Sequence, residues 1–358
     1  MKHLIDPTDI TLEETNSIIS LAEDIIAHRG NYRDRLRYHK LATLFYEPST
    51  RTRLSFTAAM MELGGNVLGF SDARNSSVSK GETVEDTVRV VGKFADIIAM
   101  RHPLEGAPYI ASTVSEVPII NAGDGSHAHP TQTLTDLLTI KRELGQIDGI
   151  TIGFCGDLKF GRTVHSLIKA LSRYKDVKVI LIAPPELRLP GYIKQDVCER
   201  MGIGYREVST IEEVMGELDV LYMTRVQKER FLDEEEFERV KDSFVLDMEK
   251  MKLAKPRMAV LHPLPRVNEI RPEVDDDPRA AYFRQVENGK FVREALIVKL
   301  LEWKDDPAHG MPQQDDPIYD ETLRCTNPKC ICNNENAPHK FHLADGTLRC
   351  WYCDHKVK

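Results

Sequence analysis

The sequence of 358 residues contains no apolar run that approaches the roughly 20 residues a membrane-spanning helix requires, and its first residues lack the apolar core of a signal peptide. Long basic runs are also missing and the formal net charge is −8, which argues against nucleic acid as a partner. No dinucleotide-binding G-x-G-x-x-G motif is formed, because Gly156 and Gly161 have the wrong spacing. We therefore expect a cytoplasmic protein that binds neither membranes nor nucleic acid.

What is present is typical of a globular α/β protein. Hydrophobic residues make up 41% and charged residues 29% of the chain, whose length suits two or three domains. From residue 41 to residue 264, apolar runs of strand length alternate with stretches of helical periodicity, which predicts parallel sheets flanked by helices. Helices are also expected after the capping-box pattern Thr11–Glu14 and over residues 282–303, before a stretch at 304–320 with linker composition.

The first candidate site is the string P-S-T-R-T-R at residues 48–53, which lies between an apolar run and a helical pattern. The unpaired N–H groups at a helix start, together with hydroxyls and guanidiniums, form a site for an anion such as phosphate. The alternative is an ordinary cap, in which Ser49 or Thr50 bonds to its own helix and both arginines are solvated.

Three later segments add polar groups that suit such a site. Ser76 and Lys80 lie in a polar loop and are able to bring a hydroxyl and an ammonium to a phosphate, although a loop lysine is more often simply solvated. Arg101 directly follows an expected strand, and ligands gather at the carboxyl ends of parallel strands. His129 and Gln132 flank a helix start, where a neutral imidazole can polarise a carbonyl, unless His129 bonds only to backbone.

In the second half, cationic and amide side chains again follow expected strands. Arg162, Arg225 and Gln227 occupy such positions, and two guanidiniums imply a substrate with two negative charges. Structural ion pairs are the alternative for each arginine. A further strand, at 259–261, leads into the sequence H-P-L-P at 262–265.

Cysteine is scarce before residue 325, where only Cys155 and Cys198 occur, and five cysteines crowd the C-terminus. The spacing Cys325-x4-Cys330 and Cys350-x2-Cys353, around a hairpin-like stretch with Asp345-Gly346, favours one structural zinc held by four thiolates, with no open position for catalysis. Disulfides or an iron–sulfur cluster are the alternatives. A fifth residue, Cys332, can substitute for Cys330, but we interpret it as a free thiol.

Together these segments resemble the catalytic chain of the aspartate carbamoyltransferase family over residues 1 to about 305. The motifs that carry the resemblance are P-S-T-R-T-R at 48–53, S-S-V-S-K-G-E at 76–82, M-R-H at 100–102, H-P-T-Q at 129–132, G-R-T at 161–163, M-T-R-V-Q at 223–227 and H-P-L-P at 262–265. The tail from about residue 322 resembles the zinc domain of the family's separate regulatory chain. That chain's nucleotide-binding domain has no counterpart here, so we expect no allosteric nucleotide site of the usual kind.

The resemblance implies an α/β fold with two doubly wound parallel-sheet domains and a small C-terminal zinc-binding β module. Residues 1–145, with a returning helix at about 286–304, would bind carbamoyl phosphate, and residues 146–285 would bind L-aspartate. Residues 305–321 would be a linker and residues 322–358 the zinc module. The zinc would be structural, one per chain, and the chemistry would need no cofactor.

The resemblance also implies a role for each candidate residue. Phosphate would be held by Ser49, Thr50, Arg51 and Thr52. The carbamoyl oxygen would be polarised by Thr52, Arg101 and His129, and Gln132 would orient the carbamoyl amine. Ser76, with Ser77 as an alternative, and Lys80 would come from a neighbouring subunit of a homotrimer with shared active sites. The aspartate carboxylates would be gripped by Arg162, Arg225 and Gln227, and the backbone at Leu264 and Pro265 would position both substrates.

Two rival functions are considered. Ornithine carbamoyltransferases normally have an Asp pocket and the motif H-C-L-P, whereas this chain has H-P-L-P with Arg225 and Gln227. A non-catalytic assembly or regulatory protein is suggested by the zinc tail, but the complete set of phosphate and carbonyl donors argues against it. We expect the tail to be an inter-subunit clamp, and trimers to be able to pair into a higher assembly.

Overall fold

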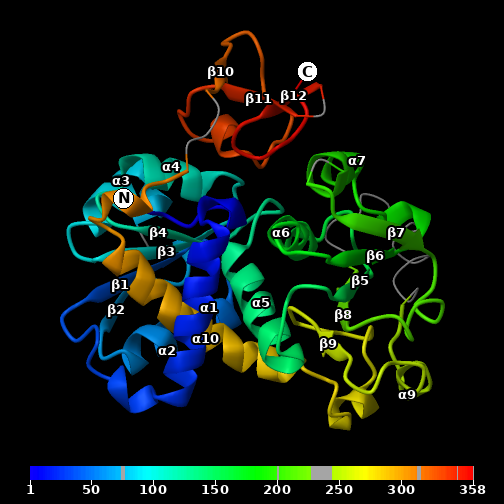
Figure 1. Cartoon of the computed structure of the whole chain (residues 1–358). Helices are drawn as coiled ribbons and strands as arrows, with labels where there is room; N and C mark the ends of the chain where they lie inside the picture. Colours follow the sequence, from blue (N-terminus) through cyan, green and yellow to red (C-terminus); the bar gives the residue numbers. More distant parts are fainter. Residues whose placement is uncertain (74–76, 200, 227–243, 313–315, 345, 358) are drawn as a thin grey trace. The chain divides into compact units, whose positions relative to one another are not determined.

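The computed structural model describes residues 1–73, 77–199, 201–226, 244–312, 316–344 and 346–357. The chain divides into two units (Figure 1). Unit 1 comprises Met1–Leu134 with Gly289–Lys358, and unit 2 comprises Thr135–Asn288. Helices α5 (Pro130–Leu144) and α10 (Tyr282–Glu302) contribute residues to both units. Among the described residues, no helix is long and apolar enough to cross a membrane.

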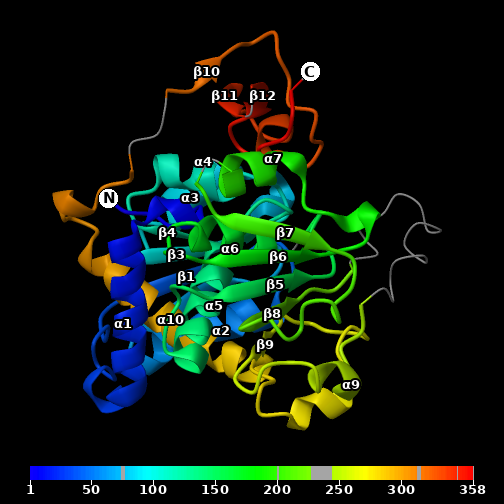
Figure 2. The same ribbon diagram turned by 45° about the vertical axis from the view of Figure 1, so that its right-hand side comes forward.

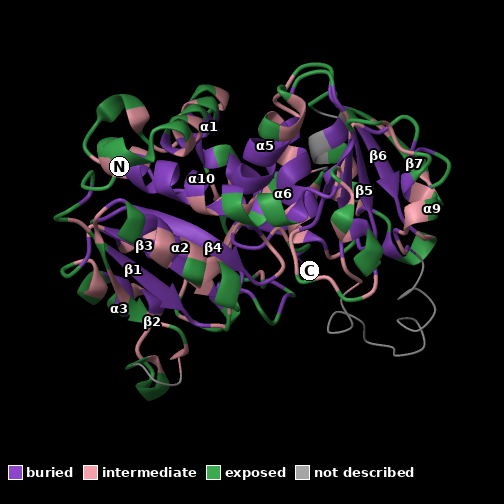
Figure 3. Ribbon diagram, turned by 90° about the horizontal axis from the view of Figure 1, so that it is seen from below, coloured by how far each residue is buried: buried purple, intermediate pink, exposed green. Residues whose placement is uncertain are grey.

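The centre of unit 1 is a sheet of parallel strands in the order β2-β1-β3-β4. Its strands are β1 (Lys40–Phe45), β2 (Asn66–Phe70), β3 (Ile97–His102) and β4 (Ile119–Asp124). Side chains alternate between the two faces of a strand, so Ala42 and Leu44 share one face, where they join a buried core with Ile98 and Met100. Strands β1, β3 and β4 are buried along most of their length (Figure 3).

The helices of unit 1 cover both faces of this sheet. Helices α3 (Val84–Val91) and α4 (Ala107–Val114) pack on the face of Ala42 and Leu44, and Figures 1 and 2 show α1, α2 and α10 over the opposite face. Helix α1 (Leu12–Ala27) begins with the predicted capping box, in which the Glu14 N–H donates to Thr11 and the Thr11 N–H donates to the Glu14 carboxylate. Short turns of helix are η1 (Pro7–Asp9), η2 (Arg29–Asn31), η4 (Ser77–Lys80) and η9 (Pro307–His309).

Unit 2 is built on a second parallel sheet, in the order β7-β6-β5-β8-β9. Its strands are β5 (Thr151–Cys155), β6 (Lys178–Ile182), β7 (Gly204–Val208), β8 (Val220–Met223) and β9 (Ala259–Leu261) (Figure 2). The parallel α/β architecture predicted from the alternating pattern is confirmed in both units. Other elements of unit 2 are α6 (Arg162–Leu171), α7 (Gly191–Ile193), α9 (Met248–Met251), η5 (Pro185–Leu187), a π-helical turn (Lys194–Glu199) and η8 (Pro272–Asp276).

The cysteine-rich C-terminal module belongs to unit 1 and contains the expected small β-sheet. Strands β10 (Ile318–Tyr319), β11 (Lys340–Ala344) and β12 (Thr347–Cys350) pair antiparallel, and η10 (Ile331–Asn333) lies between the first two. Ile331, Phe341 and Tyr352 of the module share a hydrophobic core with Val84 and Ala107, the first residues of α3 and α4. The module therefore packs on its own chain.

The module lies so close to the start of α4 that residue 106 must be glycine. Gly106, at the start of α4, has φ +84°, and a Cβ there would lie 2.6 Å from the Tyr352 Cβ and 2.9 Å from the Tyr352 carbonyl oxygen. Both the left-handed backbone and the lack of space exclude a larger residue.

Helix α10 ties several helices of unit 1 together through the buried Arg293. Its guanidinium donates to the Ser55 hydroxyl on α2 (Thr50–Glu62) at 3.0 Å and to the Thr131 hydroxyl at the start of α5 at 3.4 Å. The same group lies over the Phe56 ring. Arg293 thus fixes the positions of two helix starts that the sequence predicts to bear substrate-binding residues.

The next residue of α10, Glu294, has a buried carboxyl group whose negative charge is only weakly balanced by nearby cations. Lys290 lies 3.9 Å away and is itself bonded to Glu62 at 2.6 Å. Burial, and then the charge of Glu62, raise the pKa of Glu294 to about 8. In the unfolded chain this group ionises near its ordinary pKa of 4.5, so between pH 4.5 and pH 8 the unfolded state binds fewer protons and stability falls as pH rises.

Replacing this carboxyl by an amide removes the loss of folding stability as pH rises. We expect Glu294→Gln to melt close to the wild type at pH 5 and higher than the wild type at pH 8, by on the order of several degrees, because one pKa unit corresponds to about 1.4 kcal/mol. Thermal unfolding of both proteins across this pH range measures the difference. Glu287→Gln, at an exposed position of the same helix, is the control and should show no such trend. A constant difference between pH 5 and pH 8 would contradict the prediction.

Candidate active site and metal centre

In unit 1, the parallel pairing brings three loops to one edge of the sheet. Phe45, the last residue of β1, pairs with Arg101 of β3, and the Tyr46 N–H donates to the Arg101 carbonyl at 2.9 Å. His102 of β3 pairs in turn with Asp124, the last residue of β4. The segments that follow these strands are those predicted to hold the carbamoyl-phosphate residues.

The S-T-R-T segment forms the start of α2. Ser49 is the N-cap residue, but within the described part of the chain its side chain makes no capping hydrogen bond, so the ordinary cap considered from the sequence is not formed. Thr50, Arg51 and Thr52 occupy the first turn. Amide groups of a first turn that lack a side-chain cap, in a helix of 13 residues, are the arrangement that accommodates an anion.

Two arginines influence each other at this helix start. Burial, and then the positive charge of Arg101, lower the pKa of Arg51, which places both cations in one electrostatic environment. Arg101 also lies beside Glu47, with its Nε 2.7 Å from the carboxylate as an ion pair, and its Nη1 donates to the Ala122 carbonyl at 3.4 Å. Sequence reasoning missed Glu47, although an acidic residue directly before an arginine-rich motif is a signal that could have found it.

His129 is buried immediately before α5. Its carbonyl accepts the N–H groups of Gln132 and Thr133 at 3.0 and 3.3 Å, and its Nδ1 lies 3.5 Å from the Thr131 hydroxyl. Because Arg293 donates to that same hydroxyl, the imidazole is positioned by a chain of contacts from α10. Gln132 is partly exposed in the first turn of α5.

The loop before His129 is organised by the fully buried carboxylate of Asp124. It accepts hydrogen bonds from Gly106 N, Asn121 Nδ2 and Ala128 N at 2.9 to 3.0 Å, and it pairs with His127 Nδ1 at 3.0 Å. Burial by itself raises the pKa of Asp124, but the charge of His127 and these hydrogen bonds lower it overall. An ionised Asp124 therefore holds the loop in place.

The loop expected to act on a neighbouring subunit is only partly described. Lys80 ends the short helix η4, and both Lys80 and Ser77 are exposed. Ser76 lies outside the described residues. The role of this loop in a trimer stays a prediction.

Unit 2 places its two candidate arginines after neighbouring strands of one sheet. Arg162 is the first residue of α6, so this helix begins two residues before Val164, its first buried apolar position. Arg225 lies two residues beyond β8. Strands β5 and β8 are paired, which brings both loops to the same edge. Gln227 lies outside the described residues.

Thr224 joins these two loops. Its hydroxyl donates to the Cys155 carbonyl at 3.0 Å and accepts the Asp157 N–H at 2.9 Å. Gly156, with φ +111°, permits this approach, because a Cβ there would lie 2.4 Å from the Thr224 carbonyl oxygen. The spacing between the Arg162 loop and the Arg225 loop is thereby fixed.

The H-P-L-P segment follows β9 at the same edge and is held by a buried His262–Glu269 pair. His262 Nδ1 accepts the Leu264 N–H at 2.7 Å, and its Nε2 donates to Glu269 at 2.8 Å. Leu264, at φ +53°, precedes Pro265 in a cis peptide. Burial raises the pKa of Glu269, but hydrogen bonds from His262 and Val267 lower it overall, so the carboxylate is ionised and fixes the loop.

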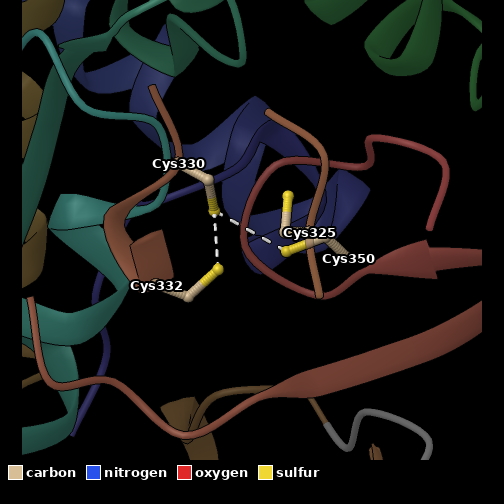
Figure 4. A group of neighbouring side chains, drawn as sticks. All are labelled: Cys325, Cys330, Cys332 and Cys350. Atoms are coloured by element: carbon tan, nitrogen blue, oxygen red, sulfur yellow. Dashed lines mark hydrogen bonds between the residues drawn. The ribbon is translucent and has the colours of Figure 1, made fainter. Parts of the chain in front are cut away.

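The module brings its five cysteines together. The sulfurs of Cys325, Cys330, Cys332 and Cys350 all lie within 4.8 Å of one another (Figure 4), and Cys353 Sγ lies 3.5 Å from Cys325 Sγ. Cys330 Sγ is 3.6 Å from Cys350 and 3.3 Å from Cys332. Zinc bonded to four thiolates at about 2.3 Å sets its sulfurs about 3.8 Å apart, so the cluster fits such an ion.

Cys332, interpreted from the sequence as a free thiol, belongs to the group of mutually close sulfurs. Cys332 and Cys353 both lie against Cys325, Cys330 and Cys350, so two residues compete for the fourth ligand position. Hydrogen bonds from Cys330, followed by Cys332, lower the pKa of Cys325, which favours a thiolate in the cluster. Cys353 also groups with Glu105 and His355.

Comparison with protein families finds three matches along the chain. Residues 2–142 match the carbamoyl-phosphate-binding domain of aspartate/ornithine carbamoyltransferases, and residues 148–300 match the aspartate/ornithine-binding domain. Residues 317–358 match the metal-binding domain of the aspartate carbamoyltransferase regulatory chain.

Individual proteins give the same result. The chain is 62% identical over 301 residues to the aspartate carbamoyltransferase catalytic subunit of Lachnoclostridium phytofermentans, which covers 84% of this chain and 98% of the relative. The catalytic subunit of M. jannaschii aspartate transcarbamoylase superposes with a TM-score of 0.78 at 50% identity, covering 84% and 98% of the two chains. Aspartate transcarbamoylase from Trypanosoma cruzi, solved in complex with carbamoyl phosphate and aspartate, superposes with a TM-score of 0.78 at 41% identity, covering 83% and 96%. The chain belongs to the aspartate carbamoyltransferase family.

Proposed function

We propose that this chain transfers the carbamoyl group of carbamoyl phosphate to the α-amine of L-aspartate, giving N-carbamoyl-L-aspartate and phosphate for de novo pyrimidine synthesis. The observation that carries the proposal is the pair of guanidiniums, Arg51 and Arg101, beside the start of α2, which lacks a cap from Ser49. A dianionic phosphate suits that environment. The relative from Trypanosoma cruzi, which binds both substrates, supports the assignment.

The phosphate half of the site is assigned to the first turn of α2. Ser49, Thr50 and Thr52 supply hydroxyls and Arg51 a guanidinium, and the helix dipole adds its positive end. Lys80, which is exposed on η4, and Ser76 complete this half from a neighbouring subunit. We therefore infer a cytoplasmic homotrimer, in which each site is finished by the next chain.

The carbamoyl oxygen is assigned to Thr52, Arg101 and His129. These donors stabilise the negative charge that develops on that oxygen. Arg101 is held in advance by Glu47 and Ala122, and His129 by Thr131. Gln132, in the turn after His129, orients the carbamoyl amine.

The acceptor half is assigned to the edge of the unit 2 sheet. Arg162 and Arg225, with Gln227, bind the two carboxylates of aspartate, and the backbone of Leu264 and Pro265 positions the reacting groups. A pocket with two guanidiniums suits a dicarboxylate and disfavours the cationic side chain of ornithine.

The reaction follows from this arrangement of donors and cations. The neutral α-amine attacks the carbamoyl carbon to form a tetrahedral oxyanion. The bond from that carbon to the phosphate oxygen then breaks, phosphate leaves with the bonding electron pair, and the attacking nitrogen loses a proton. Positioning of the reactants and stabilisation of the oxyanion account for the acceleration of the reaction.

The cysteine cluster is assigned to one structural zinc per chain. Cys325, Cys330, Cys350 and Cys353 are the proposed ligands, since they form the two spaced pairs of the sequence. The group of mutually close sulfurs contains Cys332 in place of Cys353, so Cys332 is the alternative fourth ligand. The match of residues 317–358 to a metal-binding domain supports the site. Four thiolates around one ion stabilise a module that is too small to fold on its own core.

Removing one oxyanion donor tests the catalytic assignment. Arg101→Ala and His129→Ala should each lower turnover roughly a hundredfold or more, the usual cost of one such donor. Release of phosphate from carbamoyl phosphate plus aspartate measures the rate, and Arg37→Ala, at an exposed position of unit 1, is the control. Near-normal turnover in both variants would show that the oxyanion site lies elsewhere.

The choice of acceptor tests the substrate assignment. With aspartate and ornithine present together, we expect the product to be carbamoyl-aspartate, because two guanidiniums attract the dicarboxylate. Arg225→Ala should raise the KM for aspartate about tenfold or more, the cost of a lost charge-assisted hydrogen bond, with little effect on the KM for carbamoyl phosphate. Product analysis by mass spectrometry decides the outcome, and preferential carbamoylation of ornithine would refute the proposed substrate.

Metal analysis tests the ligand set. Cys332→Ser should retain one zinc per chain, whereas Cys353→Ser should bind zinc more weakly, because only the second removes a proposed ligand. Atomic absorption after dialysis against a weak chelator gives the metal content. Loss of zinc from Cys332→Ser with retention in Cys353→Ser would exchange the roles of the two residues.

A further inference from the structure

Beyond the shared hydrophobic core, the cysteine-rich module makes polar contacts with the rest of unit 1 at two places. Each of these places adjoins a segment that carries a proposed site residue. We propose that the module acts in cis as a positioning element for both segments, so that its metal centre controls turnover at a site to which it contributes no reacting group. This inference rests on the proposed function for its activity readout. Glu335 and Glu105 are the residues that transmit the effect.

Glu335 holds the segment that follows Lys80. Its carboxylate accepts the N–H of Val84, the first residue of α3, at 3.1 and 3.2 Å. Val84 lies four residues after Lys80, and Thr83 between them caps the Asp86 N–H at 3.1 Å. First-turn N–H groups need acceptors, and here one acceptor comes from a residue 251 positions later in the chain. The C-terminal end of the Lys80 loop is thus fixed by the module.

Glu105 joins the module to the loop that carries His129. Its side chain is buried, and one carboxylate oxygen accepts from Asn327 Nδ2 at 2.8 Å while the other accepts from Ser126 N at 3.0 Å. Ser126 lies three residues before His129. A single carboxylate therefore links a residue between two cysteines of the module to the candidate catalytic loop.

The backbone of Glu105 is paired with the module as well. Its N–H donates to the Lys329 carbonyl at 2.9 Å, and its carbonyl accepts from Ile331 N at 3.0 Å, as in a short parallel β-bridge. Glu105 lies four residues after Arg101, so this pairing also fixes the segment that leaves β3. The module therefore contacts the segments that follow both β3 and β4.

A second link reaches the same loop through His127. The His127 Nδ1 pairs with Asp124 at 3.0 Å, and its Nε2 lies 3.9 Å from Asp354, which directly follows Cys353. Asp354 in turn pairs with His342 Nε2 of β11 at 2.9 Å. The imidazole of His127 is therefore held between β4 and the module.

Most of these contacts depend on the metal centre because they originate beside its cysteines. Asn327 lies two residues after Cys325, Ile331 directly follows Cys330, and Asp354 directly follows Cys353. A metal ion bonded to the cysteines fixes the local backbone, whereas its loss removes those bonds and frees the segments between the cysteines. Removal of the metal should release the Asn327, Ile331 and Asp354 contacts, and with them the loop that carries His129. The Glu335 N–H donates to the Ile331 carbonyl at 2.9 Å, so the support that Glu335 gives to the Lys80 segment should weaken as well.

Glu335→Ala tests the first contact without touching a cysteine or a proposed substrate residue. We expect the full-length variant to retain one zinc and its oligomeric size, and to show about tenfold lower kcat with a raised KM for carbamoyl phosphate. Glu335→Gln, which keeps one acceptor for Val84, should restore most of the activity. Glu321→Ala, an exposed position of the same module, is the matched control. Unchanged kcat and KM in metal-loaded Glu335→Ala would overturn the role of this residue.

Removal of the metal from the full-length protein tests the whole proposal. Hydrogen exchange of residues 77–84 and 124–129 should become faster in the stripped protein and slow again when zinc is restored, and turnover should fall and recover in parallel. Unchanged exchange in both segments after complete removal would overturn the inference. The exchange readout does not depend on the reaction, so a wild-type protein inactive toward aspartate would refute the proposed function while exchange still decided the positioning role.

Discussion

The parallel pairing of strands is the constraint on which the rest of the structure depends. In a parallel sheet every strand ends at the same edge, so segments far apart in the sequence become neighbours once the register is set. The pairing of Phe45 with Arg101 and of His102 with Asp124 does this in unit 1, and the β5–β8 pairing does it in unit 2. Each sheet consequently gathers its arginines at one edge.

Concentrated positive charge is costly in the absence of a ligand, and the protein offsets the cost locally. Glu47 balances Arg101, and an incoming dianion would offset the repulsion between Arg51 and Arg101. The loops that carry these groups are fixed by buried carboxylates, Asp124 in unit 1 and Glu269 in unit 2, each satisfied by several donors. Such rigidity lets donors be aimed before the substrate arrives.

Much of the fold was predictable because it follows from local patterns. The capping box at Thr11, the alternation of strands and helices, and the hairpin around Gly346 are encoded within short windows, and the structure confirms them. Strand and helix ends moved by a residue or two, as at Arg162, where Gly161 serves as the N-cap and starts α6 early. Several candidate site residues, such as Thr50, Arg162 and Arg225, were identifiable because they lie just after a strand or begin a helix.

The contacts that position those residues were not predictable from the sequence. Glu335 and Val84 are 251 residues apart, and Glu105 and Asn327 are 222 apart, so no periodicity or spacing connects them. From the sequence alone, Glu335 in the polar tail would be interpreted as a solvated charge. Its partner, the Val84 N–H, is brought to it only by the fold. Cys332 shows the same limit, since spacing alone selected two cysteine pairs and only the packing brought the fifth sulfur to within 3.3 Å of Cys330.

Covalent attachment of the module to the catalytic chain has a physical consequence that a separate subunit would not have. Its apolar residues Ile331, Phe341 and Tyr352 complete the core above Ala42 and Leu44, and the linker keeps that partner at high local concentration at any protein concentration. Packing of the module on the rest of unit 1 therefore does not depend on protein concentration. The contacts to the Lys80 and His129 segments begin in the module, which is why we propose that metal occupancy controls the order of both segments.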